Sequence, residues 1–238
     1  MNMTIGFGTG VFYRILADPL DRFLEEYVRL YKTGGTNAFE LLCRDEGMLD
    51  FLLADTSMDL SPFSWISLHM PDTLVYKDDE PTHRMLSKLE RLTRKFGLKN
   101  FVFHADIVQD WRVLDRYAHL PLSIENMDER KLSGRTVQDI ASILDKHDFK
   151  LTLDLQHCFV NDRSMQLARD FQEVFKDRIV EYHVSGYEER FLHYPLYKTN
   201  QPEILEALKY KETPIIIEST FDEIGEQEKE LAYIISRS

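Results

Sequence analysis

The chain has little cysteine and no long apolar run. Only two of its 238 residues are cysteine, Cys43 and Cys158. Two cysteines in a chain of this length do not form the disulfide framework of a small secreted protein, which indicates a reducing compartment. No segment reaches the roughly 18 consecutive apolar residues of a membrane span, and the first ten residues lack the basic and apolar parts of a signal peptide. We therefore expect a soluble, cytoplasmic protein without membrane contact.

Positive charge is also scarce. The chain has 29 Lys and Arg residues against 41 Asp and Glu residues, a formal net charge of −12. Nucleic-acid-binding proteins usually display a basic surface, so the balance disfavours nucleic acid as a partner without excluding it. A cluster of carboxylates that holds cations would add to the acidic total and still form a locally positive site. A small phosphoester or a sugar is the partner that we expect.

Glycine-rich phosphate-binding motifs are absent. The segment GFGTG at residues 6–10 lacks the spacing of a dinucleotide fingerprint, and no Walker motif or nucleophile elbow is present. The chain contains no low-complexity run and no long linker. Its length and its 43% apolar content suit one sizeable core. We expect a single domain over residues 1–238.

The sequence does have a regular alternation of short β-rich runs and amphipathic segments, with a period of about 30 residues. The predicted strands cover residues 5–9, 38–42, 65–69, 100–104, 120–125, 150–155, 179–183 and 214–218. The predicted helices cover residues 19–31, 47–53, 82–96, 108–117, 137–146, 165–175, 202–210 and 226–235. This alternation predicts an α/β fold, a single (β/α)8 TIM barrel.

Most of these strands end in an imidazole or a carboxylate side chain. The residues at the strand ends are His69, His104, Glu125, Asp154 with His157, His183 and Glu218. The carboxyl ends of the strands of a parallel barrel meet at one face, where barrel enzymes keep their catalytic groups. We therefore expect a site at the C-terminal face of the barrel.

The alternation of side chains along each strand supports this expectation. If the polar strand ends face the barrel axis, their apolar neighbours face outward under the helices. The outward set is Ile66, Leu68, Phe101, Phe103, Leu122, Ile124, Leu151, Leu153, Leu155, Val180, Tyr182, Ile215 and Ile217. Six strands obey the same rule.

Imidazole and carboxylate groups together favour divalent ions such as zinc, manganese or iron. Seven ligands are too many for one ion, so two ions that share a bridging carboxylate are the natural number. Asp154 and His157 are three residues apart, and we expect the strand to bend into its loop after Asp154 so that both reach the mouth. A metal would also offset the cost of burying the carboxylates.

The order H, H, E, D-x-x-H, H, E resembles the xylose isomerase-like barrel superfamily, which includes endonuclease IV of the AP endonuclease family 2 and the sugar phosphate isomerases and epimerases. The resemblance covers essentially the whole chain. It implies that His69 and His104 hold one ion together with Glu125. The same resemblance implies a second ion, bridged by Glu125 and held by the residues Asp154, His183 and Glu218.

A third ion in that family is held by the equivalent of His157 and by a D-x-H pair. In this chain His193 stands in the place of the pair's His, but Phe191 occupies the place of its Asp. The substitution puts a third ion in doubt. His193 is therefore either a third-metal ligand, a substrate contact or a packed loop residue.

The first functional hypothesis is phosphoester hydrolysis by a metal-bound hydroxide, as in endonuclease IV. The alternative is a sugar or sugar-phosphate isomerase or epimerase that uses one divalent metal, with Glu125 and Glu218 as acid and base. That alternative does not need both His69 and His104. Oxygen chemistry at an iron centre and binding of a metal or sugar without turnover also remain open.

Cationic and aromatic side chains that follow strand ends are candidates for substrate binding. The principal candidates are Arg14, Arg44, Arg190 and Tyr187; others are Arg130, Lys131, Arg163, Tyr76 and Tyr197. His83, His119 and His147 fall in helical or linker segments, and we expect them to be solvated. Cys158 is expected to be a small buried residue and not a ligand.

Overall fold

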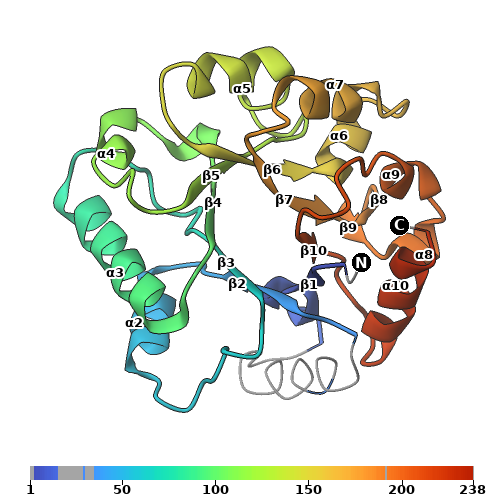
Figure 1. Ribbon diagram of the computed structural model, residues 1–238, viewed down its shortest axis with the longest axis horizontal. Helices are drawn as coiled ribbons and strands as arrows, with labels where there is room; N and C mark the ends of the chain where they lie inside the picture. Colours follow the sequence, from blue (N-terminus) through green and yellow to red (C-terminus); the bar gives the residue numbers. More distant parts are fainter. Residues whose placement is uncertain (1–2, 16–28, 30–34, 191, 238) are drawn as a thin grey trace.

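The computed structural model describes residues 3–15, 29, 35–190 and 192–237. Within these residues eight parallel strands close into a barrel, which confirms the predicted fold (Figure 1). Around the barrel the order is β1-β10-β7-β6-β5-β4-β3-β2. The strands are β1 (Ile5–Gly8), β2 (Ala38–Leu42), β3 (Trp65–His69), β4 (Asn100–His104), β5 (Leu122–Glu125), β6 (Lys150–Asp154), β7 (Ile179–Val184) and β10 (Ile215–Ile217). Each predicted strand therefore exists, with ends that differ by two residues or fewer.

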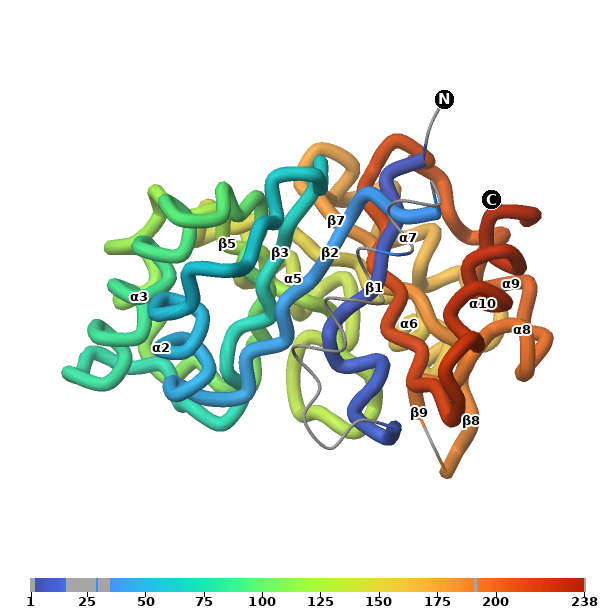
Figure 2. Tube along the Cα trace, turned by 90° about the horizontal axis from the view of Figure 1, so that it is seen from below, coloured from blue at the N-terminus to red at the C-terminus, as the bar shows by residue number. Residues whose placement is uncertain are grey.

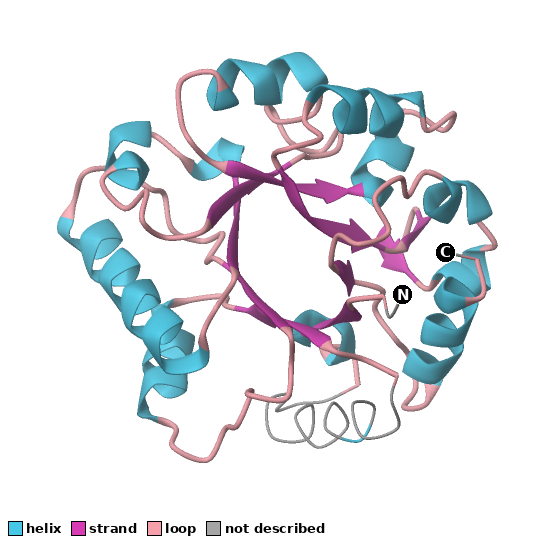
Figure 3. Ribbon diagram, viewed as in Figure 1, coloured by secondary structure: helices cyan, strands magenta, loops and turns pink. Residues whose placement is uncertain are grey.

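Helices surround the barrel, as Figure 3 shows. Those that the sequence predicted are α2 (Glu46–Ala54), α3 (Glu80–Phe96), α4 (Trp111–Asp115), α5 (Val137–Leu144), α7 (Gln166–Val174), α9 (Pro202–Glu206) and α10 (Glu226–Ile235). The elements that it missed are η1 (Thr9–Phe12), η2 (Ala105–Ile107), α6 (Leu155–Asn161), α8 (Leu196–Thr199) and the antiparallel pair β8 (Gly186–Glu188) and β9 (Leu192–Tyr194). Apart from Arg29, the helix predicted over residues 19–31 lies outside the described residues.

Local signals explain several helix ends. The Asp79 side chain accepts a hydrogen bond from the Thr82 amide at the start of α3, and Gly97 ends that helix with a φ of 66°. Thr136 and Asp139 form a reciprocal capping box at the start of α5. The α4 and α9 helices are shorter than predicted, because their amphipathic patterns continue into turns.

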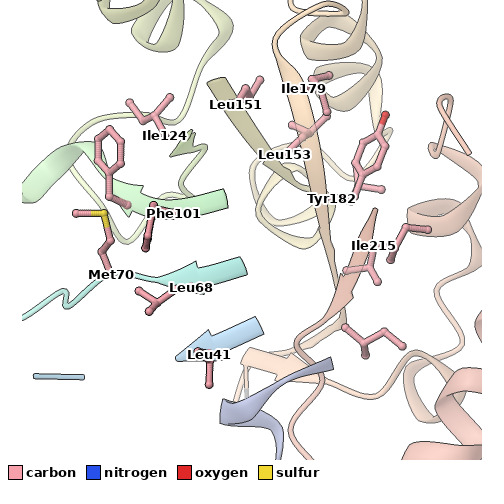
Figure 4. Packing of buried hydrophobic residues seen from close by; sticks show 14 of the residues in the cluster. Leu41, Leu68, Met70, Phe101, Ile124, Leu151, Leu153, Ile179, Tyr182 and Ile215 are labelled. Carbon is pink, nitrogen blue, oxygen red and sulfur yellow. The ribbon is translucent and has the colours of Figure 1, made fainter. Parts of the chain in front are cut away.

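The outward faces of the strands form the core beneath the helices. Figure 4 shows the side chains of Leu68, Phe101, Ile124, Leu153 and Tyr182, which come from successive strands. All five residues are fully buried. This confirms the predicted outward set, in which only Val180 is half-buried. The apolar surface removed from water on this side stabilises the barrel.

The inward faces carry a buried polar network. Asn100 donates hydrogen bonds to the Thr152 hydroxyl and to Glu181 Oε1, each over 3.1 Å. Ser123 and Thr152 share a hydrogen bond of 2.7 Å between their hydroxyl oxygens. The Trp65 indole also donates to Glu181. These bonds satisfy the polar groups in the barrel and form a rigid floor beneath the strand ends.

Figure 2 shows the barrel from the side, with both termini toward the end where the strands begin. The β8–β9 hairpin lies at the opposite end, beyond the carboxyl ends of the strands. No helix among the described residues is long and apolar enough to cross a membrane. The hairpin therefore lies on the face where the polar strand ends were predicted to gather.

Candidate metal centre

The ends of β3 and β4 bring two imidazoles together. His69 Nε2 and His104 Nε2 are 3.0 Å apart, and they lie 3.5 and 3.0 Å from Glu125 Oε2. His69 Nδ1 donates a hydrogen bond of 3.1 Å to the Met70 carbonyl oxygen, so its Nε2 is free to offer a lone pair. Two imidazole nitrogens and one carboxylate oxygen thus converge on one point.

Glu125 connects this group to a second one. Its Oε1 lies 3.0 Å from His183 Nδ1, while its Oε2 faces His69 and His104. Glu218 Oε1 lies 3.2 Å from the same His183 nitrogen. The Glu125 side chain is 2% exposed, so water cannot replace these partners. The geometry is that of a bridging carboxylate.

The other ring nitrogen of His183 faces two buried carboxylates. Its Nε2 lies 3.3 Å from Glu40 Oε2 and 3.3 Å from Glu181 Oε1. A carboxylate next to Nε2 favours the tautomer that carries its hydrogen there. His183 Nδ1 is then the lone-pair nitrogen, directed at Glu125 and Glu218.

The end of β6 differs from the predicted bend into a loop. Asp154 is the N-cap of α6, and its Oδ1 accepts a 2.9 Å hydrogen bond from the His157 amide. His157 lies in the first turn of this helix, and its side chain lines the barrel mouth. His157 Nδ1 donates to the Asn126 carbonyl oxygen over 2.7 Å, which leaves Nε2 free, 3.8 Å from Asp154 Oδ2.

Asp154 and His157 form a third group of potential ligands, which His193 joins from the β8–β9 hairpin. Its ring centre lies 5.5 Å from that of His157, and its Nδ1 shares a 2.9 Å hydrogen bond with the Ser185 hydroxyl. Phe191, which occupies the place of the expected Asp, lies outside the described residues. The hairpin thus supplies one imidazole to the mouth.

These donors form overlapping sets. Within the described residues, ligand atoms lie within 4.8 Å of one another in the sets His69–His104–Glu125, Glu125–Asp154–His183–Glu218, Asp154–His157–His193 and Glu40–Glu181–His183. Asp154 Oδ2 is buried and receives no hydrogen bond from a described residue. A divalent cation would satisfy this oxygen, and nitrogen and oxygen donors suit zinc, manganese or iron.

Burial and charge shift the pKa values of these groups. Burial raises the pKa of Asp154 to about 7 and that of Glu40 to about 7. Burial also opposes ionisation of Glu218, but the charge of His183, which is protonated when no metal ion occupies its Nδ1, outweighs burial and lowers the Glu218 pKa to about 2. For His193, burial lowers the pKa to about 4. The excess of buried carboxylates over balancing positive groups is what a bound cation would relieve.

Two adjoining cavities open onto the centre. The first, which we call the mouth cavity, has a volume of about 270 Å³ and is lined by His69, His104, Glu125, His157 and Arg130, among others. The second, the side cavity, has a volume of about 200 Å³, with Glu40, Gly8 and Arg44 among its lining residues. Leu42, His193 and Glu218 line both cavities. The two cavities therefore adjoin at these three side chains.

The predicted substrate-binding residues occupy different places. Of the principal candidates, Arg44 lines the side cavity, while Arg14 forms a 2.9 Å ion pair with Asp222. Arg190 is exposed, and Tyr187 lies 4.6 Å from the Arg163 guanidinium; neither lines either cavity.

The secondary candidates also divide. Arg130 and Lys131 line the mouth cavity and are paired with Asp128 and Asp106. Tyr76 was wrongly predicted at the mouth, because it is buried in the core and donates to the Pro71 carbonyl oxygen. Arg163 lies over the rings of Phe159 and Tyr187, and Tyr197 donates to Glu226, so neither lines a cavity.

The remaining histidines do not reach the mouth. His83 and His119 pair with Asp78 and Glu90 near the surface. His147 pairs with Asp115 and stacks on Trp111, and its side chain is only 13% exposed, so it is packed and not solvated as predicted. Cys158 is buried, as expected, and belongs to no candidate metal-ligand group among the described residues.

Sequence reasoning missed three buried acidic residues near the centre: Glu40, Glu181 and Asp128. Asp128 Oδ2 lies 3.9 Å from His157 Nε2, and the Arg130 guanidinium binds the same carboxylate. A signal for the other two was present, since Glu40 interrupts the apolar strand AFELL and Glu181 shares the parity of His183.

The fold matches several solved enzyme structures at low sequence identity. Endonuclease IV from Thermus thermophilus is 14% identical with a TM-score of 0.65, and the match covers 98% of each chain. A 3-keto-D-glucoside 4-epimerase from E. coli is 14% identical with a TM-score of 0.63, covering 98% of this chain and 99% of that one. A sugar phosphate isomerase/epimerase from Parabacteroides distasonis is 15% identical with a TM-score of 0.63, covering 98% and 93%.

No protein-family model matches the chain, and no curated protein sequence does. The resemblance predicted from the strand-end residues is thus confirmed at the level of structure. Identities near 14% establish the fold and leave the reaction to be inferred from the site. The chain has the barrel fold shared by endonuclease IV and the sugar phosphate isomerases and epimerases.

Proposed function

We propose that the chain is a metal-dependent hydrolase of small phosphoesters with a multinuclear centre at the barrel mouth. The observation that carries the proposal is the overlap of ligand sets. Glu125 belongs both to the set with His69 and His104 and to the set with His183, and Asp154 belongs both to the latter set and to the set with His157. One ion does not require this sharing, whereas neighbouring ions do.

Divalent ions held by these sets would lower the pKa of a water molecule and stabilise the charge on phosphoryl and leaving oxygens. Hydrolysis forms a bond from the water oxygen to phosphorus and breaks the bond from phosphorus to the leaving oxygen. That leaving oxygen must finally receive a proton. A metal ion on His183 would displace the imidazole proton that keeps the Glu218 pKa low. Glu218, whose side chain is 22% exposed and lines both cavities, would then be placed to accept the proton of the water.

The surroundings favour a small substrate. Arg130, Lys131 and Arg44 are the described cationic residues that line the cavities, and the first two are already paired with carboxylates. The net charge of −12 also opposes a long polyanion. A single phosphoryl group needs only the centre and one or two of these cations.

The test is hydrolysis of bis(4-nitrophenyl) phosphate and 4-nitrophenyl phosphate by protein loaded with zinc, manganese or iron. We expect turnover in wild type and a loss of kcat of at least about 100-fold in His69→Ala, because the first ligand set loses a nitrogen. His119→Ala is the matched control, since His119 lies near the surface beside Glu90. Absence of hydrolysis with every metal would overturn the proposal.

A sugar or sugar-phosphate isomerase or epimerase is the second candidate. It is favoured by the set Glu125–Asp154–His183–Glu218, which can hold one ion without the other sets. Glu125 and Glu218 would then move a proton next to a substrate carbonyl. Incorporation of solvent deuterium into a ketose, retained in a His69→Ala, His104→Ala variant, would identify this activity.

A further inference from the structure

Besides Glu218, which lines both cavities, the side cavity has a second carboxylate acceptor. Glu40, on β2, lines the cavity although the residue as a whole is 1% exposed. Its Oε2 is occupied, 3.3 Å from His183 Nε2 and 3.4 Å from the Ser67 hydroxyl, which donates to it. No described residue donates a hydrogen bond to Oε1. One oxygen of this carboxylate is therefore available to a ligand in the cavity.

Glycine in the neighbouring strand leaves that oxygen open. Gly8 pairs with Glu40 in the β1–β2 register. A Cβ atom at Gly8 would lie 3.6 Å from Glu40 Oε1, in ordinary contact with it. Any side chain at this position would therefore cover the oxygen and fill part of the cavity.

The size and the lining of the cavity limit what can occupy it. A volume of about 200 Å³ accommodates a group the size of a single ring, since a cavity of about 150 Å³ holds benzene. The walls include the apolar side chains of Val11 and Leu42, and Arg44 and Tyr13 also line the cavity. A carboxylate acceptor among such walls selects for a group that donates a hydrogen bond.

We propose that the side cavity is the subsite for a hydroxyl-bearing part of the substrate, with Glu40 Oε1 accepting the hydroxyl hydrogen. The phosphoryl part lies in the adjoining mouth cavity, so this inference rests on the proposed phosphoester chemistry. It assigns the substrate to the phosphoesters of small polyols and sugars. A substrate without the hydroxyl leaves a buried charged acceptor unpaired and is rejected for that reason.

Binding of two matched phosphonates tests the subsite without turnover. The probes are 3,4-dihydroxybutylphosphonate and butylphosphonate, whose P–C bond is not hydrolysed and which differ only in the two hydroxyl groups. Affinities are measured by titration calorimetry on zinc-loaded protein, with inorganic phosphate as a reference for the metal centre. We expect the dihydroxy compound to bind at least about 10-fold more tightly in wild type, the effect of one hydrogen bond to a charged group.

Two variants test the role of the Glu40 carboxylate, one by changing the carboxylate and one by changing the access to it. In Glu40→Gln the preference for the dihydroxy compound falls toward equal affinity, and in Gly8→Ala it falls as well because the added methyl group covers Oε1. Inorganic phosphate binding is retained in Gly8→Ala, which keeps the test valid if Glu40→Gln does not fold. Glu90→Gln is the matched control, since Glu90 pairs with His119 away from the centre and lines neither cavity.

The outcomes separate the two proposals. If phosphate binds but wild type shows no preference between the phosphonates, or if the preference survives in both variants, the subsite is wrong and the metal centre stands. If inorganic phosphate and both phosphonates fail to bind the loaded protein, the phosphoester proposal fails and the subsite fails with it.

Discussion

Glu125 directs its two carboxylate oxygens at different imidazoles, and at residue scale our proposal of a multinuclear centre rests on this arrangement. Oε1 faces His183 Nδ1 over 3.0 Å, and Oε2 faces His104 Nε2 over 3.0 Å. His183 Nε2 faces the buried carboxylates of Glu40 and Glu181, so the lone pair of its Nδ1 points at Glu125, whereas His104 Nδ1 is buried without a hydrogen-bond partner among the described residues. Loss of Glu125 would disconnect the two groups.

Asp154 provides a test at the same scale, because it both caps a helix and belongs to two ligand sets. We expect Asp154→Asn to fold, since Asn is as good an N-cap as Asp. The metal content should fall by about one ion or more per chain, because an amide is a poorer ligand than a carboxylate. Elemental analysis and thermal unfolding measure these effects.

In the presence of a chelator, the melting temperature of Asp154→Asn should equal or exceed that of wild type. The variant replaces a buried oxygen that receives no hydrogen bond from a described residue. Unchanged metal content in this variant would show that Asp154 is not a ligand.

The convergence of these side chains was predictable from the sequence, because strand parity and strand ends decide which side chains meet at the mouth. The buried carboxylates beneath them were not predicted, although Glu40 and Glu181 carry the same parity signal. These two residues lie in the middle of their strands, and the prediction considered only residues at strand ends. Asp128 lies in a loop, whose path no periodicity determines.

At the scale of elements, α6 and the β8–β9 hairpin complete the centre, and neither was predicted. The short α6 segment LQHCFVN has no clear amphipathic period, so its helix depends on the Asp154 cap and on burial. The hairpin carries His193, and its approach to α8 depends on Gly186. A Cβ atom there would lie 2.8 Å from the Tyr194 carbonyl oxygen and would also clash with the Thr199 hydroxyl.

Gly186→Ala should therefore displace the hairpin. We expect a loss of about 1–3 kcal/mol in the free energy of unfolding, the usual cost of overpacking. Metal that depends on His193 should be lost, whereas metal held by His69 and His104 should stay, which gives the experiment an internal control. Thermal unfolding and metal analysis check both. Wild-type stability together with full metal content would contradict this role for the hairpin.

At the scale of the whole molecule, the barrel could be predicted because the strand-helix period repeats along the sequence, and the closed sheet confirms it. The reaction is less predictable, since the same fold is shared by endonuclease IV and by epimerases in the solved structures. In our proposal the number of ligand sets, and not the barrel, distinguishes hydrolysis from isomerisation.

Metal removal should destabilise the whole barrel, because the ions bind the folded chain and relieve repulsion among buried carboxylates. At a free metal concentration of about 1,000 times Kd, one ion stabilises the fold by about 4 kcal/mol. This corresponds to a melting temperature lower by roughly 10 °C after chelation. Thermal unfolding with and without a chelator measures the shift. An equal melting temperature in both conditions would indicate that no ion is held in the barrel.

The most direct measurement is the metal content per chain of protein purified without added metal or chelator, for wild type and for a His69→Ala, His104→Ala variant. A multinuclear centre predicts two or more ions in wild type and about one fewer in the variant, because only the first ligand set is removed. One ion in wild type, unchanged in the variant, would contradict the multinuclear centre and the hydrolase proposal that rests on it.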